Sequence, residues 1–394
     1  MIARNLDACL ARIREREPHI HAWVKVDPQQ GAADGPLAGV PYGAKDIIET
    51  RGLPTEYGSP LYRGRIGSED AAIVSALRGL GAILVGKTHT TAFAHRDPAP
   101  TRNPRNTNHT PGGSSSGSAA AVADGMVPLA LGTQTQGSVL RPAAFCGVVG
   151  FKPTYGTLSM EGILPFAPSL DTLGFFTRNV EDAIEVWASV GGAGGRAGTV
   201  AAAASATPPL AYVDPLPPVD PPMAAAFRRA LERLGASGLT LRPIDLGEML
   251  DRLNAASRVV MCYEAARVHA ARYREHGSAL GQLVTIIHEG QGYSDTACAD
   301  ARRYIDECRE RIREVYGDTP AILVPAAVGP APEGLASTGD PRMNAPWTAL
   351  GTAAIAIPMG SHQGLPLGLQ ITADRGDDSR LLRLAQLIES KLLP

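Results

Sequence analysis

Two glycine–serine turns constrain the fold of this chain more than any other feature. They lie at residues 111–118 (PGGSSSGS) and 132–138 (GTQTQGS). Glycine permits positive φ and lets backbone N–H groups approach a ligand closely, so such turns are suited to presenting serine hydroxyls beside N–H donors. The alanines at 119–123 predict a helix capped by the preceding serines, and the apolar residues 126–131 predict a buried strand that leads into the second turn.

The rest of the chain alternates predicted helices with predicted strands. Helices are predicted at residues 5–17, 68–80, 223–234, 248–275, 294–316 and 377–392, the first ending before Pro18. Short apolar runs predict strands at 37–44, 82–85, 211–213, 321–324, 353–357 and 367–372. Residues 191–222 are rich in Gly, Ala and Pro, which indicates a connector between two halves of one fold. This order predicts an α/β protein with one mixed sheet covered by helices.

Composition and charge narrow the class of function. The formal net charge of -2, from 37 Lys and Arg against 39 Asp and Glu, gives no basic surface for nucleic acid or an anionic membrane. Five scattered cysteines form no Cys-x-x-Cys pair, which argues against a disulfide framework and against a zinc site. No apolar run approaches the ~20 residues of a membrane span, and the N-terminus lacks the apolar core of a signal peptide. We therefore predict a cytoplasmic protein that acts on small molecules and binds no metal.

Four motifs follow one another in an order that is typical of one enzyme family. They are residues 111–118, 132–138, 141–147 (RPAAFCG) and 150–154 (GFKPT). With Lys45 in the upstream segment GVPYGAKD, they resemble the amidase signature family of Ser-Ser-Lys hydrolases, over about residues 37–180 with weaker matches near the C-terminus. The resemblance implies a single α/β/α domain over residues 1–394 that hydrolyses small-molecule amides and requires no metal or organic cofactor.

The same resemblance implies the roles of the site residues. Ser138 is the nucleophile, Ser114 relays the proton and follows a cis peptide bond, and Lys45 is the terminal base. The oxyanion hole consists of the backbone N–H groups of Thr135, Gln136, Gly137 and Ser138. A lysine base must be largely neutral near pH 7, and the apolar residues around Lys45 suit this role because burial lowers a lysine pKa.

The residues alone leave alternatives for the base and for the serine loop. Lys87 also lies at the end of a predicted strand and is a rival base, and Lys45 could instead be a surface lysine paired with Asp46. Three histidines near the motifs, His89, His95 and His109, are each flanked by polar loop residues, and none has a recognisable Ser-His-Asp context. A phosphate-binding loop at 112–118 is rejected because the loop lacks the lysine that such loops require.

Departures from the family pattern GTDTGGSIR predict the substrate. Gln134 replaces the acid, Gln136 replaces the first glycine of the pair, and the arginine comes one residue later, as Arg141. Gln134 and Arg141 resemble the malonamidase-like branch, in which this arginine binds a substrate carboxylate. The resemblance thus implies a small amide with an acidic group, such as malonamate. The alternative is that Arg141 pairs with a core acid, and the Gln136 side chain could narrow the acyl pocket, donate to substrate or point away.

Other functions also remain open. A broad-specificity amidase, esterase or carbamate hydrolase would act on neutral or aryl substrates. A glutaminase-like subunit of a tRNA-dependent amidotransferase is disfavoured by Gln134, by the short C-terminal part and by the lack of a basic surface. A scaffold that had lost its chemistry is disfavoured because Lys45, Ser114 and Ser138 are all retained. The charged helical faces between Glu248 and Tyr316 either form a homodimer interface or cover the sheet.

Overall fold

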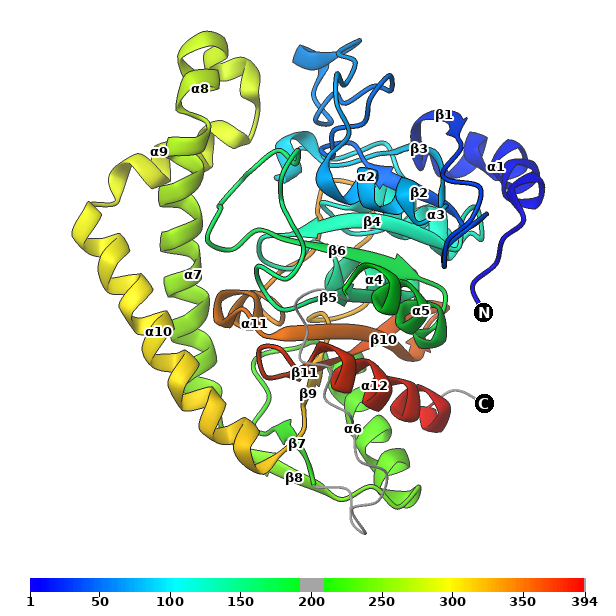
Figure 1. Ribbon diagram of the computed structural model, residues 1–394. Helices are drawn as coiled ribbons and strands as arrows, with labels where there is room; N and C mark the ends of the chain where they lie inside the picture. The colour runs from blue at the N-terminus through cyan, green and yellow to red at the C-terminus, as the bar shows by residue number, and fades with distance from the viewer. Residues whose placement is uncertain (192–208, 393–394) are drawn as a thin grey trace.

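The protein is an α/β structure built on one large mixed sheet (Figure 1). The computed structural model describes residues 1–191 and 209–392, so most of the first half of the predicted connector lies outside the described residues. In those ranges eleven strands form a sheet of order β1-β3-β2-β4-β6-β5-β10-β11-β9-β7-β8. The strands are β1 Trp23–Gln29, β2 Pro41–Lys45, β3 Ile83–Thr88, β4 Leu129–Gln134, β5 Val149–Lys152, β6 Thr172–Thr177, β7 Leu210–Val213, β8 Leu241–Ile244, β9 Ile322–Pro325, β10 Ala353–His362 and β11 Leu365–Ala373.

Helices cover both faces of this sheet, as the sequence predicts (Figure 1). They are α1 Leu6–Ile20, α2 Ala72–Gly79, α3 Ser116–Ala123, α4 Leu140–Cys146, α5 Val180–Val190, α6 Pro221–Ala236, α7 Gly247–Val268, α8 Ala270–His276, α9 Leu283–Gly292, α10 Asp295–Asp318, α11 Ala345–Leu350 and α12 Asp378–Leu392. Three short 3-10 helices are η1 Pro60–Tyr62, η2 Ala92–Ala94 and η3 Gly277–Leu280. None of the described helices is both long enough and apolar enough to cross a membrane.

Several predicted boundaries are wrong, each for a local reason. α1 continues through Pro18 to Ile20, because a proline in the last turn removes only one helical hydrogen bond and His21 then ends the helix in a left-handed conformation. α2 begins at Ala72 rather than at residue 68, because Asp70 instead accepts hydrogen bonds from Arg51 and Arg78. The helix predicted at 248–275 is divided into α7 and α8.

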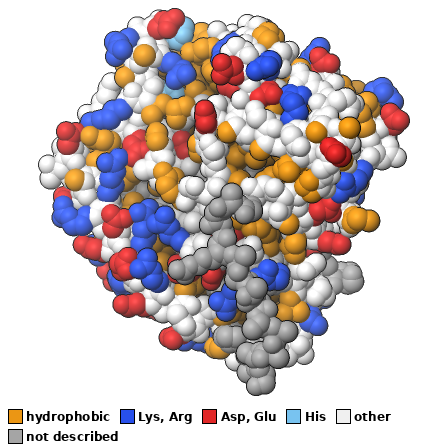
Figure 2. All heavy atoms as spheres, in the orientation of Figure 1, with side chains coloured by type: hydrophobic (Ala, Val, Ile, Leu, Met, Phe, Trp, Pro, Cys, Tyr) orange, Lys and Arg blue, Asp and Glu red, His pale blue; other side chains and the backbone are white. Residues whose placement is uncertain are grey.

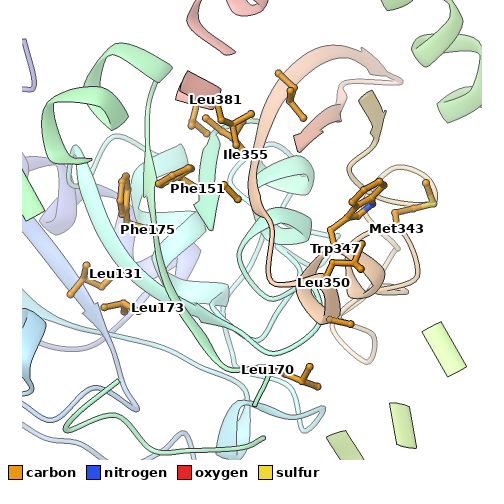
Figure 3. Close-up of a cluster of buried hydrophobic side chains, with 14 of the residues drawn as sticks. Leu131, Phe151, Leu170, Leu173, Phe175, Met343, Trp347, Leu350, Ile355 and Leu381 are labelled. Atoms are coloured by element: carbon orange, nitrogen blue, oxygen red, sulfur yellow. The ribbon is translucent and has the colours of Figure 1, made fainter. Parts of the chain in front are cut away.

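The two faces of the sheet carry side chains of different size. On one face large residues form the main core, and Figure 3 shows Leu131, Leu173, Phe151, Phe175 and Ile355 from neighbouring strands gathered there. The opposite face carries many small residues beside a few large ones such as Phe176; the small ones include the alanines of α3 and α4 and those of β4 and β10. Successive residues of a strand point to opposite faces, which explains how one strand serves both clusters.

Small residues on the second face allow α4 to lie almost against the sheet. A side chain at Gly150 of β5 would collide with Ala143, and one at Gly368 of β11 would collide with Ala144. Helix α4 is therefore fixed at a short distance from the strands, and the turn before it is fixed as well. This packing sets the position of the second glycine–serine turn.

Helices α7, α9 and α10 form an arm along one side of the molecule (Figure 1). Arginines of α10 pair with acids one turn earlier, as in Arg303 with Asp300 at 2.7 Å and Arg309 with Asp306 at 2.6 Å. Acidic and basic side chains are interspersed along this edge in Figure 2. These contacts agree with the solvated helical faces predicted from the sequence.

Close packing of α9 on α7 predicts one stability difference between two neighbouring glycines. A methyl group at Gly290 would overlap the carbonyl oxygen of Cys262, whereas one at Gly292 would meet nothing within 4 Å. We expect Gly290→Ala to lower the free energy of unfolding by about 1–3 kcal/mol through overpacking. Gly292→Ala is the matched control and should change it by less than about 1 kcal/mol. Urea unfolding of both variants tests this, and equal stabilities would contradict the packing described.

Candidate active site

Lys45 is the last residue of β2 and lies between β3 and β4. Both neighbours run parallel to β2, so the C-terminal ends of the three strands meet and bring Lys45 close to Thr133. Lys45 Nζ lies 2.7 Å from Ser114 Oγ and 2.8 Å from Thr133 Oγ1. The side chain is fully buried, and burial lowers the pKa of Lys45 to about 7 although the charge of Asp171 opposes the shift. Much of Lys45 is therefore neutral near pH 7 and can accept a proton.

Ser114 lies in the first glycine–serine turn, just before α3. The peptide bond between Gly113 and Ser114 is cis, as the resemblance implies. A side chain at Gly113 would collide with the methyl group of Thr338, so the close approach of these two segments requires glycine. The hydroxyl of Ser114 is thereby held against the amine of Lys45 in the interior of the protein.

The other serines of this turn have a structural role that differs from the prediction. Ser115 occupies the N-cap position of α3, yet its side chain makes no capping hydrogen bond, so the predicted cap is wrong. Instead Ser115 Oγ lies 3.3 Å from the backbone N and O of Thr133, and Ser116 Oγ donates to the carbonyl of Gly112 at 2.7 Å. The Ser115 contacts fasten the start of α3 to β4, and the Ser116 contact holds the turn itself.

The turn that carries Ser138 is anchored from several sides. Gln134 Oε1 accepts hydrogen bonds from the N–H groups of Val139 and Leu140 at 2.9 and 3.0 Å, and so satisfies donors at the start of α4. Thr135 Oγ1 donates to Asp171 Oδ1 at 2.6 Å. The Gln136 carbonyl accepts from Thr348 Oγ1 at 2.7 Å, and Gln134 Nε2 donates to the same hydroxyl at 2.9 Å. The backbone of the turn is therefore held in one conformation.

This anchoring leaves the backbone donors of the turn unused. Among hydrogen bonds within the described part of the chain, none uses the N–H group of Thr135, Gln136, Gly137 or Ser138. These residues line a cavity of about 60 Å³, here called the inner cavity, together with His95, Phe166 and Arg141. Ser138 itself is partly buried and faces this space. The arrangement provides a serine hydroxyl and free N–H donors beside one small cavity, as acyl transfer requires.

A larger space lies next to the inner cavity. This outer chamber has a volume of about 620 Å³ and shares five lining residues with the inner cavity, which are Arg96, Gln136, Thr338, Gly339 and Pro341. Its remaining wall comes from α7, from Gln282, from the loop at 336–342 and from Ala345 of α11. Gln136 therefore lies at the junction of the two spaces, so its side chain borders the route between them.

Arg141 is buried beside the inner cavity without an acidic partner. Its Nε donates to the Thr338 carbonyl at 2.6 Å and its Nη2 donates to the Gly113 carbonyl at 2.7 Å. Its Nη1 is buried and has no hydrogen-bond partner in the described ranges. Burial lowers the pKa of Arg141 to about 10, so the group stays cationic at neutral pH. No carboxylate of the described residues lies within 4.0 Å, so the alternative of a pair with a core acid is wrong.

The rival candidates lie in other surroundings. Lys87 Nζ donates to the carbonyl of Ile48 at 2.5 Å and to Thr55 Oγ1 at 2.8 Å, and it faces Asp46 at 4.0 Å. Asp46 thus faces Lys87, and the alternative of an exposed Lys45 paired with Asp46 is wrong.

The three histidines are divided between the cavity and the loops around it. His95 lines the inner cavity and stacks on Phe166 with ring centroids 5.5 Å apart, and burial lowers its pKa to about 3. His89 is also neutral because burial lowers its pKa to about 4. His109 Nδ1 lies 2.8 Å from the carbonyl of Ala331, which fixes the ring outside the cavity.

Sequence reasoning missed three residues that hold the site together. Asp171 accepts hydrogen bonds from Thr135 and from the N–H groups of Phe166 and Ala167, and burial raises the pKa of Asp171 to about 6. The other two are Thr133, which contacts Lys45, and Thr348, which contacts the Gln136 carbonyl. The sequence offered one signal for these three residues, which is the position of Asp171 directly before the apolar run of β6. Within the described ranges, no cluster of three or more His, Cys, Asp or Glu side chains is placed to hold a metal ion.

Comparisons with known proteins give one consistent result. A family model described as Amidase matches residues 4–382. The A subunit of the glutamyl-tRNA(Gln) amidotransferase of Lysinibacillus sphaericus (strain C3-41) is 34% identical over 406 residues, which cover 90% of this chain and 83% of that protein. A solved amidase structure superposes with a TM-score of 0.86 at 29% identity, over 98% of this chain and 95% of that one. The peptide amidase of Stenotrophomonas maltophilia superposes with a TM-score of 0.81 at 25% identity, over 98% and 93%. These matches confirm the predicted α/β fold.

The charge of Asp171 predicts a shift in the pH dependence of the site. Asp171 raises the pKa of Lys45, and with its own pKa at about 6 it is mostly ionised at pH 7. Asp171→Asn removes this charge, so Lys45 should lose its proton at a lower pH. We expect the acid limb of the labelling rate of Ser138 by a fluorophosphonate probe to move from about pH 7 to lower pH.

Asp182→Asn is the matched control for this experiment. Asp182 is a buried aspartate of α5 that pairs with Arg178, and it does not act on the pKa of Lys45. Its variant should leave the acid limb in place. An acid limb that stays at its wild-type position in Asp171→Asn, or moves to higher pH, would rule out Lys45 as the titrating base.

Proposed function

The chain belongs to the amidase family, and we propose that it releases ammonia from a small primary amide that carries a carboxylate, with malonamate as the type substrate. The family assignment makes it a hydrolase of linear amide C–N bonds. The assignment of roles to Lys45, Ser114 and Ser138 rests on the contact between the first two and on the position of the third beside the inner cavity. Arg141 is assigned the substrate carboxylate.

The proposed reaction runs through an acyl-enzyme. Neutral Lys45 accepts the Ser114 proton as Ser114 accepts the proton of Ser138, and Ser138 Oγ forms a bond to the amide carbonyl carbon. The N–H groups of residues 135–138 stabilise the oxyanion, and each such donor contributes roughly 3–4 kcal/mol in comparable enzymes. The relay returns the proton to the amide nitrogen, the C–N bond breaks and ammonia leaves. Water then gives a proton to the same relay as it attacks the ester carbonyl carbon, and the relay returns this proton to Ser138 Oγ as the C–O bond breaks and the acid leaves.

The unpartnered Nη1 of Arg141 is the observation that carries the choice of substrate. A buried donor without a partner costs roughly 1–3 kcal/mol, and a cationic one costs more. A carboxylate in the inner cavity would supply the missing acceptor and neutralise the charge. A volume of about 60 Å³ also favours a short acyl chain.

A second candidate is supported by the names of relatives. The relative from Lysinibacillus sphaericus is a subunit of an amidotransferase. Its name supports a glutaminase-like subunit more strongly than the sequence motifs alone do. Glutamine is itself a primary amide with a carboxylate, so the argument from Arg141 holds for both candidates. Purification of the protein at its native level distinguishes them. Stable partner subunits and glutamine hydrolysis that depends on those partners would favour the second candidate.

Ammonia release from malonamate and from malonamide tests the proposal directly. The two amides have the same length, and they differ in that malonamide is neutral. We expect kcat/KM to be at least about tenfold higher for malonamate, a difference of ~1.4 kcal/mol in the transition state. Arg141→Lys should reduce this ratio, because lysine keeps the charge but lacks the planar fork.

Two controls accompany this measurement. Ser138→Ala should release no ammonia from either amide. Arg105→Lys changes an arginine that contacts the carbonyl of Cys146, outside the inner cavity, and should leave the ratio unchanged. Equal kcat/KM for the two amides in the wild type would make Arg141 structural and favour a broad-specificity amidase.

A further inference from the structure

A second arginine lies where the inner cavity meets the outer chamber. Arg96 follows η2, has an exposed side chain and lines both spaces. In the ranges that the structure describes, its side chain makes no hydrogen bond and no ion pair. Arg96 is thus a cation with no partner at the entrance to the site.

The other arginines of the outer chamber are already paired. Arg258 of α7 forms two bonds to Glu289, at 2.7 and 2.5 Å. Arg342 pairs with Asp340 at 2.7 Å, in the loop that closes the chamber.

One acid of the outer chamber, Asp251 of α7, forms no hydrogen bond or ion pair with the described residues, and it does not line the inner cavity. Its charge acts on Arg342, whose pKa it helps to raise. At the junction itself, the charge without a partner is therefore that of Arg96.

The two unpaired arginines act on each other across this junction. Burial lowers the pKa of Arg141 and of His95 most, and the charge of Arg96 lowers both further, while the charge of Asp340 opposes the shift of Arg141. Arg141 and Arg96 both line the inner cavity, and none of its described lining residues is acidic. Asp340, which pairs with Arg342, offsets part of the charge of Arg141 but lies outside the lining of the inner cavity. Two cations that face one small space repel each other, and an anionic ligand between them would remove the repulsion.

The volumes of the two spaces also favour a ligand that extends from the inner cavity to Arg96. The inner cavity, at about 60 Å³, has room for a short half-amide only, whereas the outer chamber is about tenfold larger, at about 620 Å³. A substrate with a further substituent would reach the junction and pass Gln136. The group best suited to that point is a second carboxylate, because Arg96 offers a full fork of donors there.

We infer that Arg96 forms a second carboxylate subsite, so that the preferred substrates are amides that carry two carboxylates, one held by Arg141 and one by Arg96. This inference rests on the proposed function for the first carboxylate. It adds the class of substrate and names Arg96 as a residue that determines specificity.

Binding of two product analogues tests the subsite without any need for turnover. Glutarate and propane-1,2,3-tricarboxylate have the same three-carbon chain between their terminal carboxylates, and the second acid adds one carboxylate at the central carbon. In calorimetric titrations of the full chain at low salt, we expect the tricarboxylate to bind wild type about tenfold more tightly than glutarate, which corresponds to ~1.4 kcal/mol. Arg96→Gln should remove this difference and leave glutarate binding unchanged.

Two further variants show whether the charge at this position is responsible. Arg96→Lys should retain most of the difference between the two acids. Arg63→Gln changes an exposed arginine that lines neither the inner cavity nor the outer chamber, and it should have no effect on either acid. A difference that weakens as salt is added would agree with a solvent-exposed ion pair.

The outcomes separate this inference from the proposed function. Equal affinities of the two acids for wild type, equal losses of both in Arg96→Gln, or no binding of either acid at millimolar concentration would each overturn the subsite. Failure of the proposed function would appear elsewhere, as equal turnover of malonamate and malonamide. In turnover, the monoamide of the tricarboxylate should be preferred to glutaramate by wild type and by Arg63→Gln, but not by Arg96→Gln.

Discussion

The site depends on the burial of the Lys45 amine beside two hydroxyl groups. A lysine in water has a pKa of ~10.4 and is protonated at neutral pH. Here the amine has lost its hydration, and Ser114 and Thr133 provide the two neutral contacts that it retains. The sheet imposes this environment, because β3 and β4 cover β2 on both sides. A base of this kind therefore requires the centre of a fold and could not be built on a surface loop.

Packing of small residues on one face of the sheet also fixes the positions of Ser138 and Arg141. Alanines of α4 lie against glycines of β5 and β11, so the helix has little room to shift. Ser138 precedes this helix and Arg141 belongs to it, so both share its position. Because Arg141 also binds the Gly113 carbonyl, the two glycine–serine turns are linked through one guanidinium group. Anchoring by several independent contacts keeps the free N–H donors of the turn preorganised.

The sequence predicted the parts of the site that depend on local motifs. Lys45, Ser114 and the turn that ends in Ser138 come from short segments in which glycine spacing and residue type carry the information. Thr348 and Asp171 were missed because their roles arise from contacts between distant segments, and Thr348 lies 212 residues from the carbonyl that it contacts. The strand β4 was predicted to end at residue 131, yet it continues to Gln134 and so delivers Thr133 to the lysine. The last residues of this strand include glycine and polar side chains, which do not form an apolar run. They belong to the strand because pairing with β6 outweighs their weak strand propensity.

Specificity in such a site arises more from the exclusion of neutral amides than from the attraction of acidic ones. Arg141 keeps two donors occupied by backbone carbonyls and leaves Nη1 buried and unpaired. The carbonyl oxygen of a neutral amide could accept from that donor, but it carries no charge to balance the desolvated cation. A site built to bind a polar group discriminates strongly against analogues that lack it, because its own buried groups are then left unpaired. Arg96 differs in that it is exposed, so water can solvate it when no ligand is present. Exclusion of neutral amides is therefore expected to come from Arg141, and selection among acidic amides from Arg96.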